Sequence, residues 1–347
     1  MRRACRNRAD TIMVTMVRKL ILGPPGTGKT HHLTEVVIPN LKGKTYVFSF
    51  TKAGAKELSA RLQGPAAYVG TVHAFAFKAC DLIKDQVMDS PSPFFEEVGD
   101  LPEYRDHMAK YAICREKKLE MESKLISKYE AYKDARGMYD FADMLEAACK
   151  EQHSFVDNIV VDEAQDLTPL QWELILKIPC DNLIAAGDDD QSIYEWMGAA
   201  SLMQEDFDEV KVLSKSYRLP LCIYTYAQKI LKGIHARNPK QSSPNGEIGS
   251  LEFLSSYFDL IGNRSSLTVL VRDNYIKREV EDFCIQYLIP LKRILKGRLG
   301  KAFENKKQVP IKYMNYLIHF SGADKSELPM WEVRTIHSSK GMEWDDV

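Results

Sequence analysis

The sequence predicts an α/β protein built on a parallel sheet, and three observations lead to this class. Short apolar runs, each the length of a buried strand, alternate with segments of helical character. The first run passes directly into a glycine-rich loop, and a later run ends in a pair of acids. Strands that alternate with helices are typical of a parallel sheet with crossover connections. We expect strands at 20–22, 46–50, 159–161 and 183–186, and helices at 28–38 and 53–62.

Composition and charge indicate a globular protein without a global affinity for polyanions. The 347 residues are enough for two or three domains, and 45% hydrophobic and 27% charged residues are ordinary values. The formal net charge is −1, so any binding to nucleic acid would have to use local patches. The seven cysteines form no C-x-x-C pair, which argues against a zinc or redox centre and fits a reducing, cytosolic compartment.

The beginning of the chain carries no structural pattern. Residues 1–13 include four arginines, and we expect them to form a disordered arm, with an organelle transit segment as the alternative. Apolar runs in the sequence stay below the ~20 residues that span a bilayer, so we expect no membrane partner.

The glycine-rich loop is the first specific signal. Residues 23–30 read G-x-x-x-x-G-K-T, the phosphate-binding loop of nucleotide hydrolases. Its glycines let backbone N–H groups turn towards phosphate oxygens, and the positive end of the following helix faces the same anion. Lys29 would reach the β- and γ-phosphates, and the Thr30 hydroxyl would hold Mg²⁺. We expect the whole loop to bind the nucleotide: Gly23, Pro24, Pro25, Gly26, Thr27, Gly28, Lys29 and Thr30.

The acidic pair at a strand end is the second signal. Asp162 and Glu163 directly follow the apolar run 158–161. An aspartate at the tip of a buried strand is placed to ligate Mg²⁺, and a glutamate beside it can deprotonate the attacking water. The alternative is an acidic loop that caps the next helix. It applies in part to Asp166, because Thr168 and the following proline are typical of a helix start.

A longer string identifies a resemblance to a known family. Residues 187–199, GDDDQSIYEWMGA, are similar to the third motif of superfamily 1 helicases of the UvrD/Rep group. Five further segments resemble motifs of that group and occur in the group's own order: 49–53 (SFTKA), 70–75 (GTVHAF), 162–166 (DEAQD), 216–218 (SYR) and 335–345 (TIHSSKGMEWD). The resemblance implies an ATP-dependent translocase on single-stranded DNA that unwinds duplexes with 3′-to-5′ polarity, with ATP and Mg²⁺ as cofactors.

The resemblance also implies roles for residues in the nucleotide site. Gln191 would sense the γ-phosphate, and Arg218 would add positive charge there in the transition state. Tyr217 would stack on the nucleotide base. The predicted catalytic set therefore consists of Lys29, Glu163, Gln191 and Arg218.

Predicted contacts with DNA are of two kinds. Aromatic rings that stack on bases tolerate any sequence, as a translocating motor needs, and the candidates are Phe50, His73 and Trp196. Hydroxyls that bond DNA phosphates are the second kind, with Thr71 and Ser338 as candidates. Core packing is the alternative for each aromatic ring, and we assign Phe48, Phe75 and Phe77 to the core.

The resemblance implies two RecA-like parallel-sheet domains, the second incomplete, with a helical insert in the first. The expected bounds are 14–80 with 151–212 for the ATP-binding domain, 81–150 for the insert and 213–347 for the second domain. Within the insert, Glu103 to Arg136 holds nine Lys/Arg and seven Asp/Glu, which predicts a solvated helical surface. The second domain should contain strands at 267–271 and 332–336.

The chain departs from the group's pattern in three places. Residues 1–16 contain no glutamine to read adenine, and the short separation between Arg272 and Thr335 implies a severely reduced accessory domain. The sequence stops at Val347, after the fifth motif, so we expect either a truncated product or a degenerate ATPase. The basic stretch 291–312, with eight Lys/Arg and one acid, is either a solvated helix and turn or a phosphate-contacting patch.

Three functions remain open from the sequence. An ATP-dependent DNA helicase is the first, and an ATP-regulated single-stranded DNA-binding protein without productive unwinding is the second. A clamp-loader-like or chaperone-like ATPase is the third, and the string 187–199 opposes it. Expected partners are single-stranded DNA and single/double-strand junctions. We expect a monomer in the cytoplasm of a bacterial or phage-infected cell.

Overall fold

The computed structural model describes residues 16–62, 66–194, 198–199, 206–233, 240–250, 267–297, 301, 304–305, 311–321 and 330–339. Contacts divide the chain into two compact units, Met1–Leu251 and Glu252–Val347. The segment 213–250, which the sequence analysis assigned to the second domain, falls within the first unit. Every helix in the described ranges is too short or too polar to cross a membrane.

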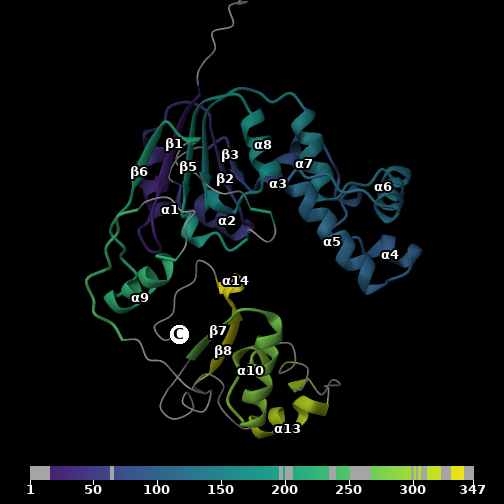
Figure 1. The fold of residues 1–347 in the computed structure, drawn as a ribbon, viewed down its shortest axis with the longest axis vertical. Helices are drawn as coiled ribbons and strands as arrows, with labels where there is room; N and C mark the ends of the chain where they lie inside the picture. Colours follow the sequence, from purple (N-terminus) through teal and green to yellow (C-terminus); the bar gives the residue numbers. More distant parts are fainter. Residues whose placement is uncertain are drawn as a thin grey trace, which may run out of the picture. The chain divides into compact units, whose positions relative to one another are not determined.

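A six-stranded sheet forms the centre of the first unit, with strand order β3-β2-β4-β5-β1-β6 (Figure 1). All its neighbouring strands run parallel, which confirms the predicted α/β class. The strands are β1 (Val17–Leu22), β2 (Thr45–Ser49), β3 (Tyr68–Gly70), β4 (Val156–Asp162), β5 (Cys180–Gly187) and β6 (Glu209–Val212). Two strands were not expected from the sequence: β3, which is only three residues long, and β6, whose four side chains are exposed.

Alternation along the strands builds one core on each face of the sheet, because successive side chains point to opposite sides. One core contains Leu20, Phe48, Ile159, Val161, Leu183 and Ala185 and is covered by α3 (Val72–Ala79), α7 (Phe141–Lys150) and α8 (Pro169–Lys177). The other contains Ile21, Val47, Val160, Ile184 and Ala186. It is covered by Leu33 and by Leu58 of α2 (Lys52–Arg61).

The helix after the glycine-rich loop is present in three short pieces. It begins as α1 (Lys29–His32), continues as the π-helical turn η1 (Leu33–Val37) and ends in the 3₁₀ turn η2 (Ile38–Asn40). Pro39 stands at the start of the last turn, where its lack of an N–H and its fixed φ are tolerated. The predicted helix at 28–38 is therefore confirmed in position.

The insert is helical, as predicted. After the 3₁₀ turn η3 (Lys84–Gln86), it contains α4 (Ser92–Val98), α5 (Pro102–Glu116) and α6 (Lys124–Arg136). These helices share a small core formed by Met88, Phe94, Phe95, Met108 and Tyr129. Asp140 caps α7, which returns the chain to the sheet, by accepting a hydrogen bond from the N–H of Asp143.

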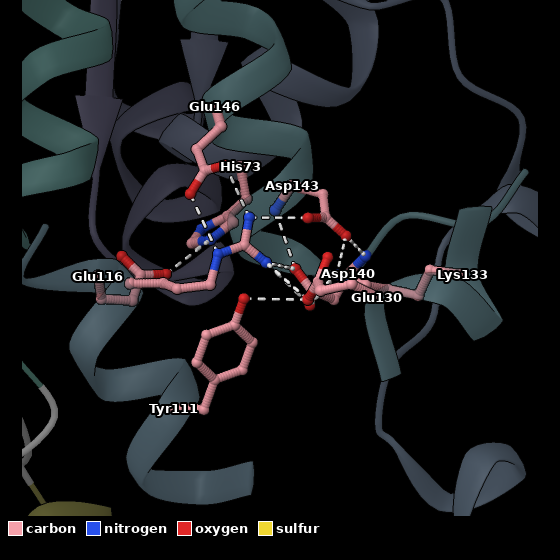
Figure 2. A network of polar contacts seen from close by, with 9 residues as sticks. His73, Tyr111, Glu116, Glu130, Lys133, Asp140, Asp143 and Glu146 are labelled. Carbon is pink, nitrogen blue, oxygen red and sulfur yellow. Dashed lines mark hydrogen bonds and ion pairs between the residues drawn. The ribbon is translucent and has the colours of Figure 1, made fainter. Parts of the chain in front are cut away.

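The expectation that the charges of the insert are solvated is wrong for two cations. The side chains of Arg115 and Lys133 are only 9% and 2% exposed. Arg115 lies 2.7 Å from Asp143 and 2.8 Å from Glu146, while Lys133 lies 2.8 Å from Asp140 (Figure 2). These three acids lie in or beside α7, outside the counted stretch, so the charge pattern of 103–136 alone could not reveal the pairing.

The second unit has a core of its own. Its parallel strands β7 (Leu267–Val271) and β8 (Trp331–Thr335) match the two predicted strands. Around them lie α10 (Asn274–Gln286), α11 (Lys292–Leu295), α13 (Ile311–His319) and α14 (Ile336–Ser339). Two cations of the basic stretch 291–312 are paired inside this unit, Lys292 with Glu332 and Arg293 with Glu281.

Candidate nucleotide site

The glycine-rich loop closes around its own lysine. The N–H of Gly23 donates to the carbonyl of Gly187 at 3.2 Å, which fixes the loop to the end of the neighbouring strand β5. The Thr27 hydroxyl donates to the carbonyl of Pro24 at 2.9 Å, and Lys29 Nζ donates to the carbonyl of Gly23 at 2.8 Å. Lys29 is buried, so its ammonium group points into the loop rather than into solvent.

Gly26 is the position at which the loop requires a glycine. Its φ is +74°, a left-handed conformation that side chains disfavour, and a Cβ there would lie 2.3 Å from the Cβ of Arg218. The Tyr217 N–H donates to the Gly26 carbonyl at 2.8 Å, and the Ser216 hydroxyl donates to the Pro25 carbonyl at 2.8 Å. The predicted segment 216–218 therefore packs directly on the loop.

Thr30 and Asp162 meet although 132 residues separate them in the chain. The Thr30 hydroxyl donates to Asp162 Oδ2 at 2.9 Å. This contact arises because β1 and β4 both pair with β5, so their carboxyl ends lie at one edge of the sheet. Ligands of open α/β sheets bind at this edge.

Asp162 is suited to a cation. Its side chain is buried, and burial, followed by the negative charge of Glu163, raises its pKa to about 6. The hydrogen bond from Thr30 and the charge of Lys29 act in the opposite direction. A divalent ion beside Asp162 would compensate the desolvated charge, and the Thr30 hydroxyl would supply a second oxygen ligand.

Glu163 stands in an unusual backbone conformation directly after the strand. Its φ and ψ of 54° and 43° are left-handed, and such residues concentrate at functional sites. Gln165 Nε2 donates to Glu163 Oε2 at 2.6 Å, and the N–H of Asp188 donates to Gln165 Oε1 at 3.0 Å. A side-chain bridge thus joins the acidic pair to the start of the string 187–199.

Gln191 is held by the same loop. It ends the 3₁₀ turn η5 (Asp189–Gln191), and its Nε2 donates to Asp188 Oδ2 at 2.7 Å. Arg218 is close enough to Glu163 for their charges to interact. Burial lowers the pKa of Arg218, while the charge of Glu163 acts in the opposite direction. Tyr217 is 71% exposed, and Lys215 Nζ lies 5.3 Å from the centroid of its ring.

The predicted DNA contacts lie in several places. Phe50 is half-buried, and its ring centroid lies 5.1 Å from that of Tyr194. His73 is half-buried beside the ring of Phe141, and its Nε2 lies 3.8 Å from Glu116 Oε1. The buried Thr71 hydroxyl accepts the capping hydrogen bond of α3 from Ala74. Of the other candidates, Ser338 is exposed in the second unit and Trp196 lies outside the described residues.

Four residues of this neighbourhood were not singled out by the sequence analysis. Glu116 accepts a hydrogen bond from the hydroxyl of Thr168, the cap of α8. Gln165 and Asp188 lie inside recognised motifs, so the motif pattern could have marked them. Lys240 contacts Asp188, Asp189 and Asp190 but belongs to no motif, and the sequence contains no local signal for it.

Comparisons with known proteins identify the family of the chain and several similar proteins. A family model described as AAA domain matches residues 8–197, more than half of the chain. DNA helicase II of Haemophilus influenzae is 24% identical over 361 residues, covering 81% of this chain and 50% of that protein. The ATP-dependent DNA helicase PcrA of Staphylococcus aureus is 22% identical over 332 residues, with 77% and 44% covered. The chain thus spans about half the length of these curated relatives.

A solved structure is also similar. The arterivirus nonstructural protein 10 helicase in complex with DNA is 13% identical and has a TM-score of 0.31, covering 74% of this chain and 44% of that one. The sequence identity and the TM-score are too low for residue roles to be assigned from that structure.

Proposed function

We propose that this chain, which belongs to the AAA domain family, is a superfamily 1 helicase of the UvrD type, an ATP-driven translocase on single-stranded DNA that unwinds duplexes. The observation that carries the proposal is the 2.9 Å hydrogen bond between Thr30 and Asp162. It joins the phosphate loop to the acidic strand end, the two parts that a Mg²⁺–nucleotide hydrolase needs side by side.

We assign nucleotide binding to the loop and its neighbours. On binding ATP, Lys29 exchanges its hydrogen bond to the Gly23 carbonyl for oxygens of the β- and γ-phosphates. The exposed ring of Tyr217 stacks on the base. Thr30 and Asp162 would hold Mg²⁺, which would neutralise charge on the phosphates.

The chemical step is hydrolysis of the bond between the β- and γ-phosphates, in which water attacks the γ-phosphorus and ADP leaves. Glu163 accepts a proton from the attacking water, and its bond to Gln165 fixes the carboxylate in place. Gln191 contacts the γ-phosphate, and Arg218 stabilises the charge that develops on it. A positioned donor of this kind is worth about 10²–10³ in kcat in other enzymes.

Movement on DNA uses a set of aromatic and hydroxyl groups. Phe50, His73 and Trp196 stack on bases, a contact worth ~1–3 kcal/mol per base whatever the sequence. Thr71 and Ser338 bond backbone phosphates. Tyr194, three residues after Gln191 in the sequence, packs on the ring of Phe50 and so links this predicted DNA contact to the segment of Gln191. Binding and release of ATP can therefore change the contacts that these residues make with DNA.

The remaining parts of the proposal concern direction and setting. Movement is 3′-to-5′ on the bound strand, the partners are single strands and single/double-strand junctions, and the protein works as a monomer. The site of action is the cytoplasm of a bacterial or phage-infected cell. The resemblance of the motifs to the UvrD/Rep group supports these assignments.

One pair of assays tests the proposal. ATP hydrolysis is measured with and without an oligo-dT strand, and strand displacement is measured on duplexes with a 3′ or a 5′ tail. We expect strong stimulation by the strand and displacement of the 3′-tailed duplex alone. Stimulation without displacement would limit the activity to translocation. DNA binding without hydrolysis in either condition would contradict the proposal and favour an ATP-regulated DNA-binding protein.

A further inference from the structure

A buried lysine lies among three consecutive aspartates beside the nucleotide site. Lys240 Nζ contacts carboxylate oxygens of Asp188 and Asp189 and lies 3.0 Å from Asp190 Oδ2. The lysine side chain is only 1% exposed. Oxygens of the three aspartates all lie within 4.8 Å of one another. Such carboxylates repel one another, and the buried ammonium group compensates that repulsion.

One of the aspartates that Lys240 contacts, Asp188, binds the predicted γ-phosphate sensor. Asp188 uses one carboxylate oxygen for Lys240 and the other for Gln191 Nε2, which donates to it at 2.7 Å. The Asp188 N–H donates to Gln165, whose amide in turn donates to Glu163. Asp188 therefore contacts the sensor directly and the proposed general base through Gln165.

Lys240 also connects this loop to the segment that carries Arg218. The lysine's own segment pairs with residues 214–216, since the Ser243 N–H donates to the Ser214 carbonyl at 2.8 Å and the Ser216 N–H donates to the Ser243 carbonyl at 2.9 Å. Lys240 thus links the loop that holds Gln191 with residues 214–218, which pack on the phosphate loop.

We propose that Lys240 is a positioning residue for hydrolysis, which orients Gln191 through Asp188 and ties it to the segment of Arg218. This role rests on the proposed function of the site. Lys240 acts through the carboxylate of Asp188. Burial works against the charge of Lys240, but the aspartates outweigh it, so its pKa is raised and the group stays protonated at neutral pH.

The kinetic test compares Lys240→Met with Lys240→Arg, which keeps the charge. The matched control is Lys232→Met, because Lys232 is exposed at the end of α9 (Leu221–Leu231). With a saturating oligo-dT strand, we expect Lys240→Met to lower kcat at least tenfold while KM for ATP changes less than threefold. Lys240→Arg should recover most of the loss, and Lys232→Met should match the wild type. An unchanged kcat, or an equal loss of nucleotide binding, would overturn the proposal.

A second measurement does not depend on activity. Hydrogen–deuterium exchange of the amides of residues 187–192 should be at least tenfold faster in Lys240→Met than in the wild type, and unchanged in Lys232→Met. Equal exchange in all three proteins would overturn the proposal. If the wild type hydrolyses no ATP, the proposed function fails, while this exchange measurement still tests Lys240. If Lys240→Met does not fold, Lys240→Gln replaces it, with a loss of at least fivefold expected in kcat.

Discussion

The carboxylate of Glu116 accepts a hydrogen bond from the hydroxyl of Thr168. Glu116 is the last residue of α5 in the insert, and Thr168 caps α8, two residues after the acidic motif ends. The other carboxylate oxygen of Glu116 lies 3.8 Å from Nε2 of His73, a predicted DNA contact (Figure 2). One side chain thus links the segment that follows the proposed catalytic acids with the segment that carries a predicted DNA contact.

We predict that Glu116→Ala weakens the stimulation of ATP hydrolysis by DNA. Removing the carboxylate breaks the link between the two segments without changing the nucleotide site, and couplings of this kind are worth about 0.5–2 kcal/mol, or roughly twofold to thirtyfold. The measurement is the ratio of hydrolysis rates with and without an oligo-dT strand. Glu120→Ala, at an exposed position just beyond α5, serves as the control. A ratio equal to that of the wild type would contradict the prediction.

Glu163→Gln should abolish turnover but retain nucleotide binding. The amide keeps the size and a hydrogen-bond partner for Gln165 but cannot accept a proton from water, and general bases contribute about 10²–10⁴ in rate. Steady-state hydrolysis gives kcat, and titration with a fluorescent ATP analogue gives Kd. Retained turnover would show that Glu163 is not the base.

Tyr217→Ala should raise KM for ATP with little effect on kcat. Stacking on the base is present in both the ground state and the transition state, so its loss weakens binding without slowing the chemical step. We expect an increase of about tenfold, as stacking is worth ~1–3 kcal/mol. Tyr275→Ala is the control, because Tyr275 is equally exposed, at 71%, but lies in the second unit. An unchanged KM would exclude Tyr217 from the base site.

Asp140→Asn should destabilise the insert in a pH-dependent manner. Burial alone would raise the pKa of Asp140, but Lys133 and Arg115 outweigh it and hold that pKa below its usual value. The charge therefore stabilises the fold above about pH 4, the ordinary value for aspartate, and its contribution is lost as the pH falls through the lowered pKa. At pH 7 we expect a loss of about 3 kcal/mol in the free energy of unfolding, because two buried cations lose a partner.

Urea unfolding of the wild type and of Asp140→Asn between pH 3 and pH 7 measures this difference. Asparagine can still cap α7, so the substitution isolates the charge. Asp134→Asn, at an exposed position of α6, should behave like the wild type at every pH. A difference between Asp140→Asn and the wild type that does not shrink at low pH would point to a cause other than ionisation.

The sequence by itself determined the class of fold and the main parts of the candidate site. Apolar runs located the strands β1, β2, β4 and β5, since a buried strand needs a continuous apolar stretch. Glycine in a left-handed turn and acids at a strand end are local requirements, so the phosphate loop and the pair Asp162–Glu163 could be identified from short segments. Their meeting at one sheet edge followed from parallel pairing.

Only the tertiary structure decided which distant charged groups form ion pairs. Lys133 and Arg115 belong to a mixed-charge stretch that looks solvated, yet both are buried because Asp140 and Asp143 approach from α7. Lys240 carries no motif, and its role depends on three aspartates 50 or more residues earlier. A sequence pattern records only neighbours along the chain. Electrostatic energy depends on distance in space and on burial, and both are set only when the helices and strands have packed.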